Sequence, residues 1–325
     1  MRKKNQLTYL FATVAGAATA ATAVQYLIQK REAEARLRVG SALIETTRGP
    51  VECAVIGSGP AVLVSHGSLG GYDQGLAIGR PLADAGFTVV AVSRTGYLRT
   101  PLYTGPTPEA QADAHAAILD ALGIEHAAIL GASGGGPSAA LFALRHPERC
   151  KALIMMCTVS QRFTPSTAQA SPIFSAIISA MRSDFAIWSL LSSVRLALPL
   201  LGALNPEIQK RVIDDPARRR MFEGVLRSMF PVSTRQIGLE NDLLRIGHMR
   251  PIPLDQVATP TLVLHGQHDS LVPVVQAEYT AAHIPGAQLI TFGDGADHGF
   301  FISHYDEVWP QAIAFLRRHV GNTGA

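Results

Sequence analysis

The residue best suited to chemistry in this chain is a serine inside a glycine-rich pentapeptide. The sequence G-A-S-G-G at residues 131–135 directly follows a short apolar run and precedes a stretch with helical character. Between a strand and a helix, G-x-S-x-G forms a sharp turn that exposes the serine. The turn strains the backbone and leaves little room on either side, so glycine is needed two residues before and after it. The pattern predicts Ser133 as a nucleophile; the alternative is a glycine-rich loop with a capping serine.

A serine hydroxyl is a weak nucleophile at neutral pH, so it needs a base within hydrogen-bond reach and a third group to orient that base. His298 stands between the last expected strand and a final helix near Asp306, and we predict it as the base. Asp269 follows another expected strand, and the order Ser, Asp, His is the one this strand-turn-helix architecture uses. Asp294 and Asp297 are rivals, but Asp297 adjoins His298 and is poorly placed to reach the far ring nitrogen. We therefore predict Asp269 as the orienting acid.

Acyl transfer also requires backbone N–H groups that bind the negative oxygen of the tetrahedral intermediate. The segment S-H-G-S-L-G-G at residues 65–71 follows an expected strand and supplies flexible backbone. We predict the N–H groups of Ser68 and Gly134 as the oxyanion hole. His66 is expected to stabilise this loop and not to act as a second base.

These side chains must be positioned by the elements between them. Six short apolar runs lack polar alternation, as strands covered on both faces do: 61–65, 88–92, 127–130, 152–156, 261–264 and 288–292. Helical stretches such as 108–122 and 137–146 lie between most of them, which predicts an α/β fold with a mostly parallel sheet flanked by helices. Runs 42–46 and 51–55, separated by a turn signal, predict a hairpin.

One long interval, from residue 159 to about 250, contains no convincing strand and reads as a helical insertion. Phe174, Phe185 and Trp188 belong to its apolar helical faces. These side chains would suit a lipophilic acyl or alcohol group, or they pack only against the core.

From residue 41 to 319 the chain resembles the α/β-hydrolase-fold family, because the loops at His66, Ser133, Asp269 and His298 occur in family order. The resemblance implies that the serine, acid and histidine form a catalytic triad, with the oxyanion hole at the positions already predicted. It also implies that the insertion is a helical cap over the site. We expect a hydrolase core over 41–158 and 251–320, a cap over 159–250 and a separate N-terminal segment over 1–30.

One motif departs from the family pattern. Many members carry Asp-Arg-x-Gly after the fourth strand, where this chain has Ser93-Arg94-Thr95-Gly96, so the role of that aspartate is in doubt. The serine at position 133 argues against the haloalkane dehalogenase and epoxide hydrolase branches, which use a carboxylate nucleophile.

The expected activity is that of a serine hydrolase that cleaves a carboxylic ester of a lipophilic small molecule through an acyl-enzyme on Ser133. A thioesterase, amidase, perhydrolase or carbon–carbon bond hydrolase would use the same triad. A catalytically silent member that binds a ligand or serves as a scaffold is an alternative from a different class. No metal and no organic cofactor is implied.

The start of the chain carries a membrane signal. Basic residues at positions 2–4 precede residues 7–28, an uncharged run of about 22 residues that could cross a hydrocarbon core of about 30 Å. We expect a single-pass N-terminal membrane anchor, with a cleaved export signal and a soluble amphipathic helix as alternatives. The sequence does not indicate on which side of the membrane the rest of the chain would lie, since basic residues flank the run at both ends.

The composition narrows the function classes further. Of the 325 residues, 47% are hydrophobic and 16% charged, which excludes disorder over most of the length. The net charge of +3 and the scattered basic residues do not indicate nucleic-acid binding. The spacing of Cys53, Cys150 and Cys157 matches neither a disulfide framework nor a zinc site, so we expect buried apolar thiols.

Overall fold

A computed structural model describes residues 2–162, 182–192 and 206–321, with side chains from residue 19 onward. The chain divides into two units, Met1–Val39 and Gly40–Ala325, each of which is described by itself.

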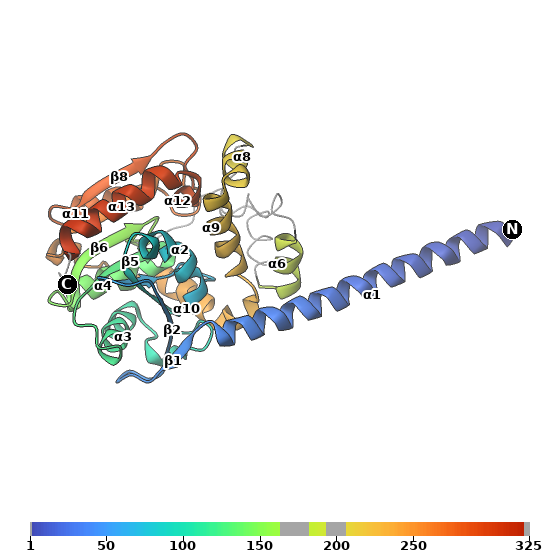
Figure 1. Ribbon diagram of the computed structural model, residues 1–325, viewed down its shortest axis with the longest axis horizontal. Coiled ribbons are helices and arrows are strands. Elements are labelled where there is room, and N and C mark those ends of the chain that lie inside the picture. The colour runs from blue at the N-terminus through green and yellow to red at the C-terminus, as the bar shows by residue number, and fades with distance from the viewer. Residues whose placement is uncertain (1, 163–181, 193–205, 322–325) are drawn as a thin grey trace. The chain divides into compact units, whose positions relative to one another are not determined.

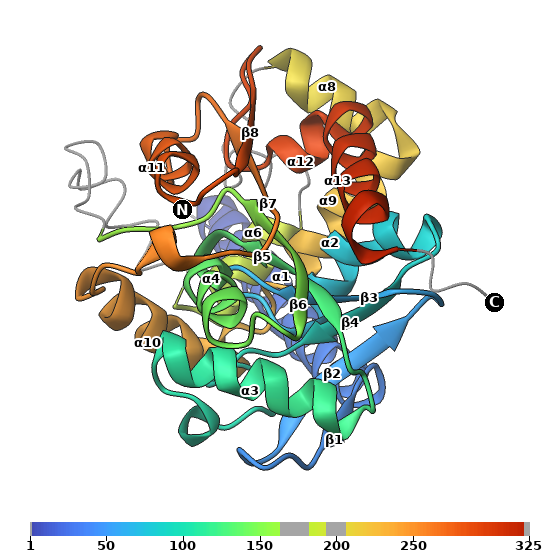
Figure 2. The same ribbon diagram turned by 90° about the vertical axis from the view of Figure 1, so that its left-hand side faces the viewer.

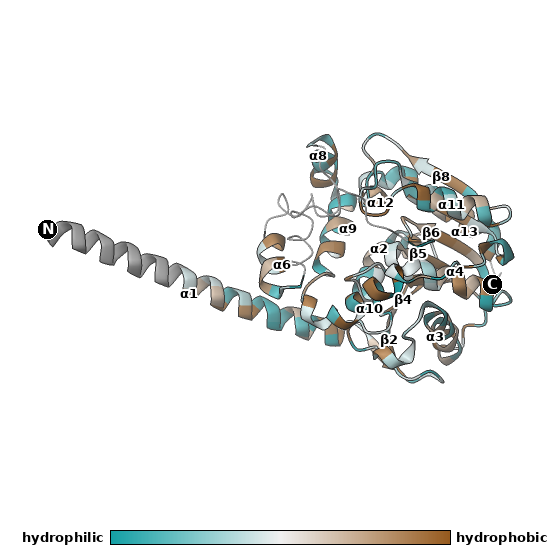
Figure 3. Cartoon of the chain, turned by 180° about the vertical axis from the view of Figure 1, so that it is seen from behind, coloured by the Kyte–Doolittle hydropathy of each residue, from teal (hydrophilic) through white to brown (hydrophobic). Residues whose placement is uncertain are grey.

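The first unit is a single helix, α1 (Arg2–Val39), which continues past the expected end at residue 30. The prediction of a membrane anchor is wrong: within the described residues, no helix combines the length and the hydropathy needed to span a membrane. The uncharged run owes much of its length to Ala, Gly and Thr, whose side chains contribute little apolar surface, and charged residues follow from Lys30. In Figure 3, hydrophilic residues recur along the coloured part of the α1 ribbon.

The second unit is built around one sheet (Figure 1). In the described residues, its strands follow the order β1-β2-β4-β3-β5-β6-β7-β8. The strands are β1 (Ala42–Ile44), β2 (Val51–Ile56), β3 (Ala61–Ser65), β4 (Thr88–Val92), β5 (Ala127–Ala132), β6 (Cys150–Met156), β7 (Thr261–Gly266) and β8 (Gln288–Phe292).

Pairing within this sheet confirms the predicted topology. β1 and β2 form the expected antiparallel hairpin, and β2 also pairs antiparallel with β4. From β4 to β8, every neighbouring pair is parallel. Strands β3 and β5 are buried along their whole length, which explains their unbroken apolar sequences.

Helices cover both faces of the sheet, as Figure 2 shows. On one face α3 and α4 pack together, and the core cluster there also contains Ala277 of α11. α2 and α13 contact each other on the other face. Their bounds are α2 (Tyr72–Asp84), α3 (Pro108–Ala121), α4 (Gly136–Arg145), α11 (Val275–His283), α12 (Phe300–Ser303) and α13 (Tyr305–Val320). The three cysteines are buried free thiols, as expected.

Between β6 and β7, the described residues form helices and no strand. These are α6 (Asp184–Leu191), α8 (Pro206–Asp214), α9 (Pro216–Arg227) and α10 (Gln236–Gly247), with short 3₁₀ helices η4 (Val232–Thr234) and η5 (Leu254–Gln256). Two further 3₁₀ helices, η1 (Leu102–Thr104) and η2 (Ser133–Gly135), belong to the core. The helix expected around Phe174 lies outside the described residues. α9 packs against α2, so part of this interval is joined closely to the core.

The parallel register brings the chemistry-bearing loops to one place. Because parallel strands end at the same edge, the residues after β3, β5, β7 and β8 meet at the carboxyl edge of the sheet. Those four loops carry Ser68, Ser133, Asp269 and His298, respectively.

Candidate active site

The turn at Ser133 has the geometry that the glycine pattern predicts. Ser133 follows β5 directly and has a φ of 49°, in the left-handed region that non-glycine residues rarely adopt. A Cβ added at Gly135 would overlap the carbonyl oxygen of Ser65, and one added at Gly131 would lie 2.7 Å from the Cβ of Ala139. Glycine is therefore required at both positions because the turn is pressed between β3 and α4.

The structure brings Ser133, His298 and Asp269 into one chain of hydrogen bonds. The Ser133 hydroxyl lies 3.1 Å from Nε2 of His298, and Nδ1 of His298 lies 2.7 Å from Oδ2 of Asp269. Since an ionised carboxylate can only accept, Nδ1 carries the proton and Nε2 accepts the serine O–H. This is the arrangement in which an imidazole can take a proton from a hydroxyl.

The charges of Asp269 and protonated His298 stabilise each other. Burial alone would lower the pKa of His298, but the adjacent charge and hydrogen bond of Asp269 raise it above its usual value, with a further contribution from Asp297. Burial acts to raise the pKa of Asp269, yet the neighbouring His298 and hydrogen bonds from His265 and Val272 hold that pKa well below its usual value. Asp269 is therefore a permanent negative charge that favours a protonated His298.

The Asp269 carboxylate is fixed on its other oxygen as well. Oδ1 accepts the backbone N–H groups of Leu271 and Val272 at 2.9 and 2.8 Å. A second imidazole, that of His265, lies with Nε2 3.3 Å from Oδ2. Local spacing did not single out His265; its position four residues before Asp269 is a weak signal for such a contact.

Asp297, a rival for the acid position, is not joined to His298 by a hydrogen bond in the described residues. Its Oδ1 accepts the backbone N–H of Gly299, while its buried Oδ2 has no hydrogen-bond partner in that part of the chain. Burial raises the pKa of Asp297 to about 6. The other rival, Asp294, is a loop residue with a φ of 47°.

The two predicted oxyanion donors lie side by side. The backbone nitrogen of Ser68 is 3.5 Å from the position that a Cβ on Gly134 would take. Among the backbone hydrogen bonds outside helices and strands of the described residues, none is donated by the Ser68 N–H. The two N–H groups remain the predicted oxyanion donors.

The loop that carries Ser68, residues 66–71, is called the oxyanion loop below. His66 is fully buried; its Nδ1 bonds the Gly67 carbonyl at 2.6 Å, and its Nε2 accepts the Arg94 backbone N–H. Burial, followed by the charge of Arg94, lowers the pKa of His66 far below its usual value. A neutral ring with both nitrogens occupied stabilises the loop, as expected, and is not available as a base.

The structure shows what surrounds Ser93, at the position where the family resemblance led us to expect an aspartate. The Ser93 hydroxyl donates to Oε2 of Glu52 at 2.9 Å, and Arg99 donates to Oε1 of the same carboxylate at 2.7 Å. A buried carboxylate from the neighbouring strand β2 therefore sits beside this position. Its source could not be predicted because Glu52 lies 41 residues away in the sequence.

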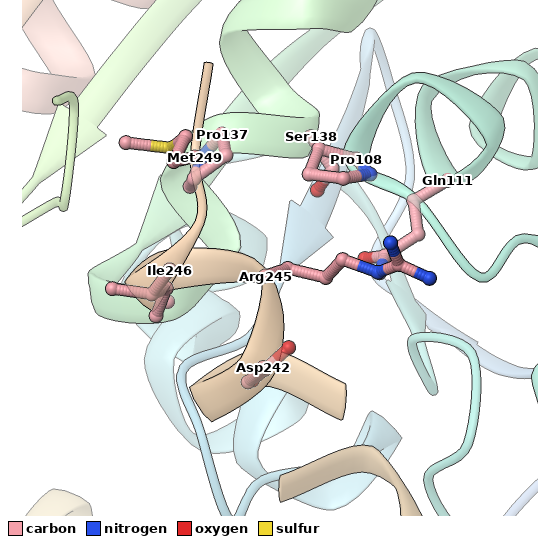
Figure 4. A pocket seen from close by; sticks show the side chains of 9 residues that line it. Pro108, Gln111, Pro137, Ser138, Asp242, Arg245, Ile246 and Met249 are labelled. Atoms are coloured by element: carbon pink, nitrogen blue, oxygen red, sulfur yellow. The ribbon is translucent and has the colours of Figure 1, made fainter. Parts of the chain in front are cut away.

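A small crevice lies beside Gly134, between α3, α4 and α10 (Figure 4). Its wall includes Pro137, Asp242 and Met249. Of the aromatic residues expected to contact substrate, Phe174 lies outside the described residues, Phe185 is half exposed and Trp188 is buried, with the Phe185 and Trp188 rings 5.5 Å apart. Among the described side chains, no group of three or more His, Cys, Asp or Glu is arranged to hold a metal ion.

Comparison with known proteins supports the fold. An alpha/beta hydrolase fold protein from Nakamurella multipartita superposes with a TM-score of 0.70 at 32% identity, covering 85% of this chain and 99% of that one. The 2-hydroxymuconate semialdehyde hydrolase of Pseudomonas putida is 30% identical over 54% of this chain and 57% of its own length. The pimeloyl-[acyl-carrier protein] methyl ester esterase of Aromatoleum aromaticum (strain DSM 19018 / LMG 30748 / EbN1) is 28% identical over 70% and 86%. Because the family profile of the alpha/beta hydrolase fold matches residues 60–304, this chain belongs to that hydrolase family.

Proposed function

We propose that the protein is a serine hydrolase that cleaves a carboxylic ester of a small lipophilic molecule. The observation that carries this proposal is the continuous hydrogen bonding from Asp269 through His298 to the Ser133 hydroxyl, with distances of 2.7 and 3.1 Å. Ser133, His298 and Asp269 would act as nucleophile, base and orienting acid.

In the first half of the reaction, Ser133 Oγ attacks the ester carbonyl carbon while Nε2 of His298 takes the hydroxyl proton. The carbonyl oxygen becomes an oxyanion that accepts hydrogen bonds from the N–H groups of Ser68 and Gly134. As the tetrahedral intermediate collapses, the carbon–oxygen bond to the alcohol breaks, and His298 gives its proton to the departing oxygen. An acyl group then remains on Ser133.

In the second half, a water molecule loses a proton to His298 and attacks the acyl carbon. The same two N–H groups bind the second oxyanion, and collapse returns the proton to Ser133 as the carboxylic acid leaves. Asp269 holds the imidazole in the tautomer that this cycle needs and stabilises its protonated form.

We further propose that residues 41–158 and 251–320 act as the catalytic core and that 159–250 act as a helical cap. The support is that the described part of the interval is helical and that Asp242 of α10 contacts Ser68. The cap would then supply surface for the lipophilic part of the substrate.

A second candidate activity is carbon–carbon bond hydrolysis with the same triad. It is favoured by the likeness to the 2-hydroxymuconate semialdehyde hydrolase, which is 30% identical over 54% of this chain, against 28% over 70% for the esterase relative. Fold-level likeness alone does not separate the two reactions, because both would begin at the same serine.

The deciding experiment combines a fluorophosphonate probe with a substrate panel. We expect the full chain to be labelled at Ser133, and Ser133→Ala to remain unlabelled while it folds normally. p-Nitrophenyl esters of increasing acyl length, tested beside 2-hydroxymuconate semialdehyde, identify the preferred bond. A folded wild-type protein that resists the probe would favour a silent binding protein, and faster turnover of the semialdehyde than of every ester would favour the second activity.

A further inference from the structure

Two buried charged residues from the interval between β6 and β7 contact the oxyanion loop. Arg235 immediately precedes α10, and Asp242 lies seven residues later within it. Asp242 contacts Ser68, and Arg235 contacts Gly70 and Asp73, so both side chains reach residues 66–73.

Asp242 accepts four hydrogen bonds from three side chains of the core. Its Oδ2 accepts the Ser68 hydroxyl at 2.8 Å and the Tyr97 hydroxyl at 2.6 Å. The Arg94 guanidinium bonds both oxygens, with Nη1 2.8 Å from Oδ1 and Nη2 on Oδ2. Side-chain exposure of this ion pair is only 2% for Arg94 and 5% for Asp242, so solvent hardly screens it.

Arg235 binds the other end of the same loop. Its Nη1 donates to the Gly70 carbonyl at 2.6 Å, and its Nη2 donates to Asp73 at 2.8 Å. The side chain of Arg235 is fully buried. The oxyanion loop is thus held through its side chain at Ser68 and through its backbone at Gly70.

The backbone of α10 also approaches the core too closely to slide. A Cβ added at Gly238 would overlap the Tyr97 ring, and one added at Gly96 would lie 2.9 Å from the Gly238 Cα. Gly238 stands between Arg235 and Asp242 in the sequence, so this close contact fixes the helix between its two charged attachments.

We propose that Asp242 and Arg235 are positioning residues that hold the oxyanion loop so that the Ser68 N–H faces the reacting oxygen. This inference rests on the proposed function, since it assigns a purpose to the Ser68 N–H during acyl transfer. The loop needs such support because it contains three glycines and a left-handed Leu69 with a φ of 63°. An oxyanion donor is effective only when it is fixed in the right place before the charge develops.

The charge of Asp242 does not oppose an oxyanion near Ser68, because Arg94 neutralises it through two hydrogen bonds. This pairing explains why a carboxylate can serve as the attachment point there.

The test removes the hydroxyl that links Ser68 to Asp242 and keeps the backbone N–H of residue 68. Ser68→Ala deletes the hydroxyl that donates to Asp242, and Ser233→Ala is the matched control because it deletes a hydroxyl that bonds Asp184 at 2.7 Å and not a residue of the loop. With p-nitrophenyl acetate, we expect kcat of Ser68→Ala to fall about tenfold at unchanged KM, as for a partly misplaced donor. The pH at which activity declines should not move, since the His298 contacts are unchanged.

Hydrogen exchange gives a second measurement on the same variants. The amides of residues 66–71 should exchange faster in Ser68→Ala than in the wild type and in Ser233→Ala. A double-mutant cycle with Asp242→Asn should show that the two substitutions are not additive in kcat. If the Asp242 variant does not fold, Ser68→Ala alone decides.

Unchanged kcat in Ser68→Ala overturns the inference, whether or not the loop exchanges faster. A fall in kcat equal to that of Ser233→Ala also overturns it. In either case the wild-type protein remains reactive toward the probe, whereas failure of the proposed function leaves wild-type Ser133 unlabelled.

Discussion

Nε2 of His265 lies 3.3 Å from Oδ2 of Asp269, the same oxygen that accepts from His298. This nitrogen also bonds the Val272 carbonyl at 2.7 Å, and because both partners only accept, it must carry the ring proton. His265 is fully buried, and within the described residues its Nδ1 has no hydrogen-bond partner. Asp269 is therefore oriented by two histidines, His298 and His265, and within the described residues His265 makes no hydrogen bond to Ser133.

The first prediction concerns this second histidine. His265→Gln can still donate to Asp269 and Val272, so it should keep most of the activity, whereas His265→Leu loses both hydrogen bonds. We expect the leucine variant to lose about 2 kcal/mol in free energy of unfolding and roughly tenfold in kcat, because a buried carbonyl is left unpaired. Urea unfolding and ester turnover of both variants measure this. Equal activity in the two would show that His265 does not orient Asp269.

The second prediction concerns pH dependence. Because Asp269 raises the pKa of His298, and the base must be neutral, activity should fall as the pH drops through this raised pKa. Asp269→Asn should move the fall to lower pH and reduce kcat by about 10,000-fold, since the imidazole loses its tautomer control. Profiles of kcat/KM between pH 5 and 9 show the direction in which the decline in activity moves. A shift to higher pH in the variant would contradict the assigned electrostatics.

The third prediction concerns Asp297, whose pKa burial raises to about 6. A raised acid pKa makes ionisation costly in the folded state, so this group's contribution to stability falls as the pH rises from about 4 to above 6. About two units at 1.4 kcal/mol each correspond to about 3 kcal/mol. Between pH 4 and 7, the wild type should lose about that much relative to Asp297→Asn in chemical unfolding. The Asn variant should also lower the pKa of His298, which a parallel pH profile would detect.

The fourth prediction concerns the crowded turn after β5. Gly135→Ala places a Cβ against the backbone carbonyls of Ser65 and His66, neither of which can move without displacing β3. We expect a loss of about 2 kcal/mol or more in free energy of unfolding and a lower reactivity of Ser133. Gly247→Ala is the control, since nothing lies within 4 Å of its added Cβ. Thermal unfolding of both variants measures the difference, and equal midpoints would refute the steric argument.

Much of the fold could be predicted from local patterns. The apolar runs marked each strand in the described residues to within three residues at either end. For β3 and β5 the reason is that strands buried on both faces cannot alternate with polar residues. The same logic failed at the start of the chain. There the absence of charge suggested a membrane anchor, although Ala, Gly and Thr make up much of the uncharged run.

The predicted site residues follow from local rules as well. Ser133 was predicted from its flanking glycines, and Asp269 and His298 were predicted from their places after apolar strands, since all parallel strands end at one edge of the sheet. Their catalytic roles stay predictions until the labelling and pH experiments are done.

What the sequence determined by itself is therefore the order of strands and helices and the loops that carry the serine, the acid and the histidine, because backbone periodicity and turn chemistry act over a few residues. Only the tertiary structure decided which groups support them. Asp242 meets Ser68 across 174 positions, and Glu52 meets Ser93 across 41. Such contacts depend on how distant elements pack, and no short-range pattern encodes a partner that the folded chain brings from so far away.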